Sequence, residues 1–63
     1  MNTIIRTNQS GSKLIDLVTL DLAILPNKGD EIVIKDAHYT ITNRVFVVPR
    51  LDDTYVILYV DKL

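Results

Sequence analysis

Short apolar segments rich in β-branched residues, separated by clusters of turn-forming residues, limit what this 63-residue chain can fold into. Segments of this length and composition are typical of β-strands, whereas helices need longer stretches with a period of 3.6 residues. The extended segments that we expect are residues 3–7, 14–25, 31–35, 38–48 and 55–60. The sequence therefore predicts one all-β domain, residues 1–63, with a four- to five-stranded antiparallel meander or barrel and little or no helix.

Residues 14–25 are the segment in which a helix competes with a strand. Apolar side chains three and four residues apart fit one face of a helix, and leucine is a good helix former. Leu20 and Leu22, however, alternate with polar residues in the pattern of a half-buried strand. A helix would also place Asp21 on its apolar face. We therefore favour the strand and retain the helix as the alternative.

Proline, glycine and acidic residues mark the turns between the expected strands. Pro26 removes a ladder donor, Gly29 can adopt a positive φ, and Asp30 can accept backbone N–H bonds. We interpret residues 26–30 as a sharp corner rather than a phosphate-binding loop, because a strand follows and no Gly-Lys-Ser/Thr motif is present. Other turns are expected at residues 8–12, with Gly11 at a positive φ, at residues 36–37 and at residues 49–54.

The alternation of apolar and polar residues changes phase at Asn43 and Arg44, because residues 45–48 are apolar without interruption. A phase change within a long β segment predicts a bulge or bend, and a small barrel needs such corners to close. Residues 55–60 form a second nearly continuous apolar run, which is typical of a strand covered on both faces.

The shortness of the chain predicts a thin core, because a protein of about 60 residues buries only roughly 60% of the surface of its unfolded form. The chain contains no cysteine and one histidine, so we expect no disulfide, no metal and no cofactor. The many apolar residues in the segments 14–25, 45–48 and 55–60 then favour a homo-oligomer, with a two-fold dimer as the default. The alternative is a barrel that closes fully on itself.

The charge of the chain weighs against nucleic acid as the main partner. Seven basic and eight acidic side chains give a formal net charge of −1, whereas a nucleic-acid-binding protein normally has a strong basic excess. The first residues are too few and too polar for a signal peptide, and no segment approaches the roughly 20 apolar residues of a membrane helix. We therefore expect a cytoplasmic protein with no membrane partner, for which nucleic acid is possible but not favoured.

The residue types predict that the protein is not an enzyme. A catalytic site needs a nucleophile with a base, or paired carboxylates, that converge in a pocket. Asp52 and Asp53 are adjacent, so within a strand their side chains would point to opposite faces. We expect the single histidine, His38, to be an exposed residue at the start of a strand.

Basic and aromatic side chains form the candidate binding set. Arginine next to exposed aromatic residues can bind phosphates and stack against bases in small barrels. The residues that we assign to a ligand- or partner-binding site are Arg44, Arg50, Tyr39, Lys28, Arg6 and Tyr55. The alternative is a structural role, in which Tyr39 and Phe46 belong to the core and Arg44 pairs with a nearby carboxylate.

Three stretches of the chain resemble a pattern found in short proteins of bacteriophages and other mobile elements. They read LPNKGDEIVI, YTITNRVF and YVILYV, and they lie within residues 25–60. In that pattern a Pro-x-x-Gly-Asp turn precedes a hydrophobic strand, a tyrosine with alternating apolar residues, and a last strand. The resemblance implies a Src-homology-3-like β-barrel in the cytoplasm of a bacterial host. Residues 14–24 lie outside it.

The function that we expect is that of a non-enzymatic binding or interaction protein of phage or mobile-element type. It would be homo-oligomeric, and it would bind a host protein or sequester a small anionic ligand. Inhibition of a bacterial defence system is implied by the resemblance alone. The alternatives are a small nucleic-acid-binding barrel and a minor structural protein of a virion.

Overall fold

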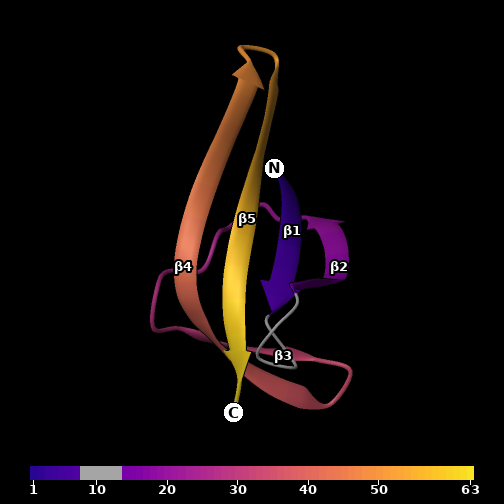
Figure 1. Cartoon of the computed structure of the whole chain (residues 1–63), viewed down its shortest axis with the longest axis vertical. Helices are drawn as coiled ribbons and strands as arrows, with labels where there is room; N and C mark the ends of the chain where they lie inside the picture. The colour runs from indigo at the N-terminus through magenta and orange to yellow at the C-terminus, as the bar shows by residue number, and fades with distance from the viewer. Residues whose placement is uncertain (8–13) are drawn as a thin grey trace.

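The computed structural model contains one curled sheet (Figure 1). It describes residues 1–7 and 14–63. The strands in this part of the chain are β1 (Asn2–Thr7), β2 (Ile15–Asp21), β3 (Glu31–Ile34), β4 (Ala37–Arg50) and β5 (Asp53–Lys62). The prediction of an all-β domain with four or five strands is confirmed. The described residues form no helix, and hence none that is long and apolar enough to cross a membrane. The turn expected at residues 8–12 lies outside the described residues.

The strand order in the sheet is β2-β1-β5-β4-β3, so strands that pair in space are not all consecutive in sequence. β1 pairs in parallel with β5, and the other three pairs are antiparallel. The observed connectivity therefore differs from a simple antiparallel meander. It places the apolar run of residues 55–60, which lies in β5, in the centre of the sheet, where β1 and β4 pair with its two edges.

β5 supplies the largest part of the core. Val56, Ile57 and Leu58 are buried in succession, as expected for a strand that is covered on both faces. Val56 and Leu58 belong to a cluster on one face of the sheet, and Ile57 points to the opposite face. The other buried members of that cluster are Ile5, Tyr39, Ile41 and Val60.

β2 confirms the strand interpretation of the ambiguous segment, but it is shorter than expected. It ends at Asp21, whereas the sequence suggested extension to Leu25. The reason is the length of its partner, because β1 begins at Asn2, which pairs with Asp21. One further backbone bond joins Leu22 N–H to Met1 O at 3.0 Å, and the chain then leaves the sheet.

The corner between β2 and β3 has the geometry that the sequence predicted. Gly29 has a φ of +94°, and Asp30 Oδ2 accepts a bond from Asn27 N–H at 2.7 Å. Gly29 N–H also donates to Ile41 O at 2.8 Å, and Ile41 N–H donates to Asp30 O at 2.9 Å. The corner is therefore tied to β4 by backbone bonds on both sides of Asp30.

The turn between β3 and β4 lies one residue earlier than expected. It consists of Lys35 and Asp36, whose φ values are +49° and +68°. Ile34 pairs with Ala37, which leaves a two-residue loop. Both residues must adopt positive φ because that twist matches the twist of the flanking strands.

β4 contains a bulge one residue before the predicted position at Asn43 and Arg44, and it contains one unexpected proline. The register with β5 shifts between Ile41 and Asn43, which leaves Thr42 as the extra residue. Pro49 was expected to begin a turn, but β4 continues through it to Arg50. β3 pairs with β4 only as far as Thr40 in the described structure, so the missing N–H of proline costs no ladder bond on that side.

Candidate functional site

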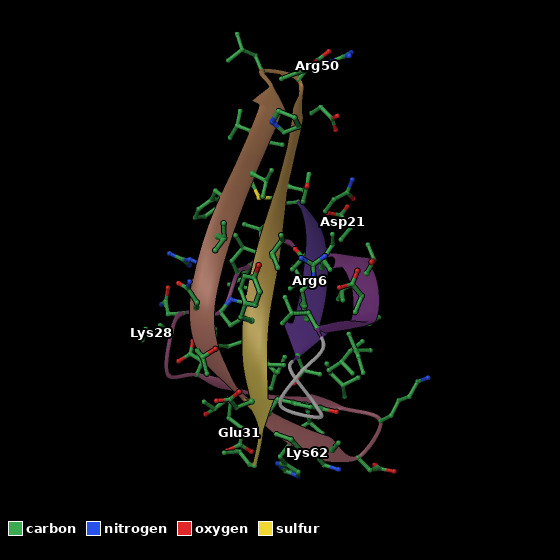
Figure 2. All side chains as sticks on the ribbon, viewed as in Figure 1. Arg6, Asp21, Lys28, Glu31, Arg50 and Lys62 are labelled. Atoms are coloured by element: carbon green, nitrogen blue, oxygen red, sulfur yellow. The ribbon has the colours of Figure 1, made fainter. Side chains whose placement is uncertain are left out.

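The six residues of the predicted binding set do not converge on one site. Arg50 lies at the end of the β4–β5 hairpin, far from Lys28 and Arg6, which lie on opposite sides of the view in Figure 2. Tyr39 is only 5% exposed and belongs to the core, so it offers no surface for stacking. The set therefore forms no single cluster of cations and aromatic rings.

Arg6 is engaged by Asp16, its direct partner across β1 and β2. Nε donates to Oδ1 at 2.5 Å and Nη2 donates to Oδ2 at 3.3 Å. The hydrogen bond with Asp16 raises the pKa of the Arg6 guanidinium above its ordinary value, and Tyr59 adds to this effect. The same bond with Arg6 lowers the pKa of the Asp16 carboxyl. This pair joins β2 to β1 and explains the presence of Arg6 without a ligand.

Arg44 binds to the β2–β3 connection. Its Nη1 donates to Asn27 Oδ1 at 2.9 Å and approaches Pro26 O at 3.5 Å. Its guanidinium carbon lies 5.4 Å from the centre of the Phe46 ring, within the range of a cation–π contact. The alternative in which Arg44 pairs with a carboxylate differs from what is observed, because the acceptors are an amide and a backbone carbonyl.

The structural alternative for the aromatic residues is correct for Tyr39 and wrong for Phe46. The Phe46 side chain is 50% exposed, because it lies where β4 has passed beyond the end of β3. Tyr55 is half-buried and pairs with Val47 across the hairpin. Both aromatic residues thus lie at or beyond the limit of the core rather than inside it.

The end of the β4–β5 hairpin extends past the start of β1 and stands apart from the rest of the sheet (Figure 1). We call residues 46–55 the arm. β1 pairs with β5 from Val56 onward, so in the described structure both outer edges of the arm lack a neighbouring strand. Phe46, Val48 and Leu51 are 50%, 56% and 99% exposed. The arm therefore carries exposed apolar side chains together with the charged residues Arg50, Asp52 and Asp53 at its end, and no strand flanks either of its outer edges in the described structure.

An apolar cleft of about 310 Å³ lies between the two edge strands, β2 and β3. It is distinct from the arm, and no described residue that lines it carries a polar side chain. The lining residues are Ile5, Val18, Leu20, Leu22, Pro26, Ile32, Val33 and Ile34. Because β2 and β3 do not pair with each other in the described structure, the curled sheet remains open at this place.

The acidic residues and the histidine offer no comparable site. His38 is exposed, as the sequence predicted, and its Nδ1 lies 2.5 Å from Glu31 Oε2 across the β3–β4 pair. Asp52 and Asp53 are exposed at the end of the arm. In the described part of the chain, no three His, Cys, Asp or Glu side chains are grouped so that they could hold a metal ion.

Sequence reasoning missed the arm and the cleft for different reasons. Residues 45–48 were recognised as part of the apolar surface that exceeds what a thin core can bury. Their position beyond the neighbouring strands, however, depends on where those strands begin and end. Leu20 and Leu22 were recognised as one apolar face, and residues 31–35 were expected to form a strand. That these two segments line one cleft across an unpaired gap depends on strand order, for which no local pattern exists.

Two of the four cations in the predicted binding set are engaged within the described structure, Arg6 by Asp16 and Arg44 by Asn27. Exposed apolar side chains lie on the arm, at Phe46, Val48 and Leu51, and also at other places on the described surface. Comparison with models of protein families, with characterised proteins and with solved structures finds no match to this chain.

Proposed function

We propose that the protein is a non-enzymatic interaction protein that attaches to a protein partner through the arm. The single observation that carries this proposal is Leu51, which is 99% exposed at the end of an apolar hairpin. A leucine side chain loses its favourable transfer free energy when it is left in water, and an extended apolar projection promotes aggregation unless a partner covers it.

The edges of the arm support the same function. An unpaired strand edge offers a row of N–H and C=O groups that another chain can pair with, in the manner of β-strand addition. Apolar side chains and free edges occur together between residues 46 and 55. A protein partner can satisfy both, whereas a small ligand can satisfy neither along the length of the arm.

Sequestration of a small anionic ligand is less well supported. It requires several cations that converge, but Arg6 is engaged by Asp16 and Arg44 by Asn27. Arg50 is far from Lys28 (Figure 2). The phage or mobile-element type, the cytoplasmic location in a bacterial host and the inhibition of a defence system stay predictions that rest on the sequence resemblance.

Replacement of Leu51, at the end of the arm, by a charged residue tests the proposal. Leu51→Asp is compared with Ile24→Asp, because Ile24 is 85% exposed and lies in the β2–β3 connection, away from the arm. Association is measured by sedimentation equilibrium of the purified protein and by quantitative capture of partners from a bacterial extract. We expect Leu51→Asp to weaken association about tenfold or more, since a buried leucine contributes at least that much to binding.

The matched variant decides the interpretation. Ile24→Asp should retain the association of the wild-type protein, because it adds the same charge at a different exposed apolar position. Circular dichroism confirms that both variants remain folded. Equal association of all three proteins, with equal capture, would show that the arm is not the binding surface.

A further inference from the structure

We infer that the connection between β2 and β3 is a strap that opens as a local unit, and that Arg44 is the latch that keeps it closed. We call residues 22–30 the strap. Its opening displaces Leu22 and Pro26, which form part of the wall of the apolar cleft, so the latch controls the width of that cleft. The inference goes beyond the proposed function, because it does not depend on what the arm binds.

The strap crosses the face of the sheet that carries the core cluster, and little of its own surface is buried. It runs from β2 to β4 and then returns to β3 (Figure 1). No residue of the strap is fully buried, and Ile24 is 85% exposed. Leu22 and Leu25 are only half-buried where they pack against the core cluster. Segments with few buried apolar contacts open locally at a lower free energy than core strands do.

Backbone hydrogen bonds hold the strap at its two ends. At the start, Leu22 N–H donates to a carbonyl just before β1 at 3.0 Å. At the end, Gly29 N–H donates to Ile41 O at 2.8 Å, and Ile41 N–H donates to Asp30 O at 2.9 Å. Residues 23–26 form no backbone hydrogen bond with the described part of the chain. The position of the middle of the strap therefore depends on side chains.

Arg44 joins this middle part of the strap to β4. Its Nη1 donates to Asn27 Oδ1 at 2.9 Å and approaches Pro26 O at 3.5 Å. The Phe46 ring lies 5.4 Å from the guanidinium carbon, and a cation–π contact at this distance favours the orientation in which the guanidinium reaches the strap. Release of the bond to Asn27 frees the segment that carries Pro26, a residue of the cleft wall.

Amide hydrogen exchange, measured by nuclear magnetic resonance, tests the latch. The amides of Gly29 and Ile41 report the opening of the strap, because their bonds join it to β4. The amides of β5, the central strand, report global unfolding. Arg44→Met removes the latch. Thr42→Val is the matched control on the same strand, because it removes the bond from Thr42 Oγ1 to Tyr59 O at 3.1 Å, which joins β4 to β5 and persists when the strap opens.

We expect the Gly29 and Ile41 amides of the wild-type protein to exchange at least about tenfold faster than those of β5, after correction for intrinsic rates. Arg44→Met should raise the exchange rates of Gly29 and Ile41 about two- to tenfold, which is the factor that one such hydrogen bond contributes to an equilibrium. Asn27→Ala should raise them similarly, because it removes the other half of the same bond. Thr42→Val should raise exchange in β5 and leave Gly29 and Ile41 unchanged, because its bond is present with the strap closed or open.

Two results would overturn the inference. Equal exchange in the strap and in β5, with Thr42→Val raising both by the same factor, would show that the strap opens only with global unfolding. Exchange at Gly29 and Ile41 that neither Arg44→Met nor Asn27→Ala raises would show that Arg44 is not the latch. These measurements involve no association, so failure of this inference is distinguishable from failure of the proposed function.

Discussion

Arg44 Nη1 lies 2.9 Å from Asn27 Oδ1, and this bond joins the middle of β4 to the connection between β2 and β3. The two residues are 17 positions apart in the sequence. The connection carries Leu22 and Pro26, which line the apolar cleft, so the bond holds one wall of the cleft in place. In the described structure the guanidinium of Arg44 is thus engaged in holding the β2–β3 connection.

Removal of this bond is expected to destabilise the protein slightly. Arg44→Met keeps a long apolar stem and loses the donor, which should lower the free energy of unfolding by about 0.5–1.5 kcal/mol. Urea unfolding measures the change. Asn27→Ala should give a similar loss, and the double variant should lose less than the sum because both changes remove one interaction. The control is Lys62→Met at an exposed position, with an expected change within about 0.5 kcal/mol. Strict additivity of Arg44→Met and Asn27→Ala would contradict this assignment.

The Arg6–Asp16 pair predicts a specific dependence of stability on pH. The hydrogen bond with Arg6 lowers the pKa of the Asp16 carboxyl in the folded protein, so the ionised carboxylate stabilises the fold at pH values above its unfolded pKa of about 3.9. That contribution is lost as the pH falls through the lower pKa of the folded state. Asp16→Asn should therefore lose less stability than the wild-type protein on acidification.

The carboxyl titration of Asp16, followed by nuclear magnetic resonance, provides the direct measurement. Its midpoint should lie below the ordinary value of about 3.9 in the wild-type protein and return toward that value in Arg6→Gln. Lys62→Gln, which removes a distant charge, should leave the midpoint unchanged because salt and solvent screen it. A midpoint that Arg6→Gln does not move would show that the pair is not the cause of the lowered pKa.

Gly29 is required by backbone conformation and not by space. Its φ is +94°, and no atom lies within 4 Å of the position that a Cβ would occupy. Gly29→Ala should lower the free energy of unfolding by about 1–2 kcal/mol, which is the cost of a left-handed conformation for an L-residue. Gly29→Asn should cost less because asparagine tolerates positive φ better, and Lys28→Ala should change stability by less than about 0.5 kcal/mol. If thermal unfolding shows that Gly29→Asn is no more stable than Gly29→Ala, backbone conformation is not the reason why glycine is required at this position.

The β3–β4 turn offers the opposite experiment, a stabilising change. Lys35 and Asp36 both have positive φ, in a two-residue loop for which Asn-Gly is the preferred sequence. Replacing Lys35-Asp36 by Asn-Gly should raise the free energy of unfolding by about 0.5–2 kcal/mol, within the range of other local optimisations. Ala-Ala at the same positions should lower it, since alanine does not favour positive φ. Denaturant unfolding measures the free energy of unfolding of the wild-type, Asn-Gly and Ala-Ala proteins. An Asn-Gly protein that is less stable than the Ala-Ala protein would contradict this turn geometry.

Local patterns were sufficient to predict the strands, because side-chain periodicity and turn chemistry depend on neighbouring residues. The alternation of Leu20 with polar residues identified β2 as a strand, and Gly29 with Asp30 identified the corner. The ends of strands were predicted less well. β2 ends at Asp21 because Asp21 pairs with Asn2, the first residue of β1. β4 continues through Pro49, which lies beyond the last partner on β3 and within the register shift between Val47 and Arg50 of the β4–β5 pair.

The candidate site could not be predicted because it depends on which strands are neighbours. Arg6 and Arg44 were identified as cations suited to a ligand, but strand pairing places Asp16 opposite Arg6, and the fold brings Asn27 to Arg44. The structural alternative placed Phe46 in the core, yet it lies beyond the end of β3 and is half exposed. Residue type indicates what a side chain can bind, whereas its position in the sheet determines which side chains lie next to it.

The sequence by itself determined the all-β class, the corner at Gly29, a bulge next to Asn43 and the extended, largely buried character of residues 55–60. Each of these follows from the conformational preferences and apolar pattern of adjacent residues. Only the tertiary structure decided that β1 lies parallel to β5, that β2 and β3 remain unpaired edges in the described structure, and that the β4–β5 hairpin extends beyond both. Strand pairing is formed by backbone groups that are the same in every residue, so the choice of partner depends on how the whole chain buries its apolar surface.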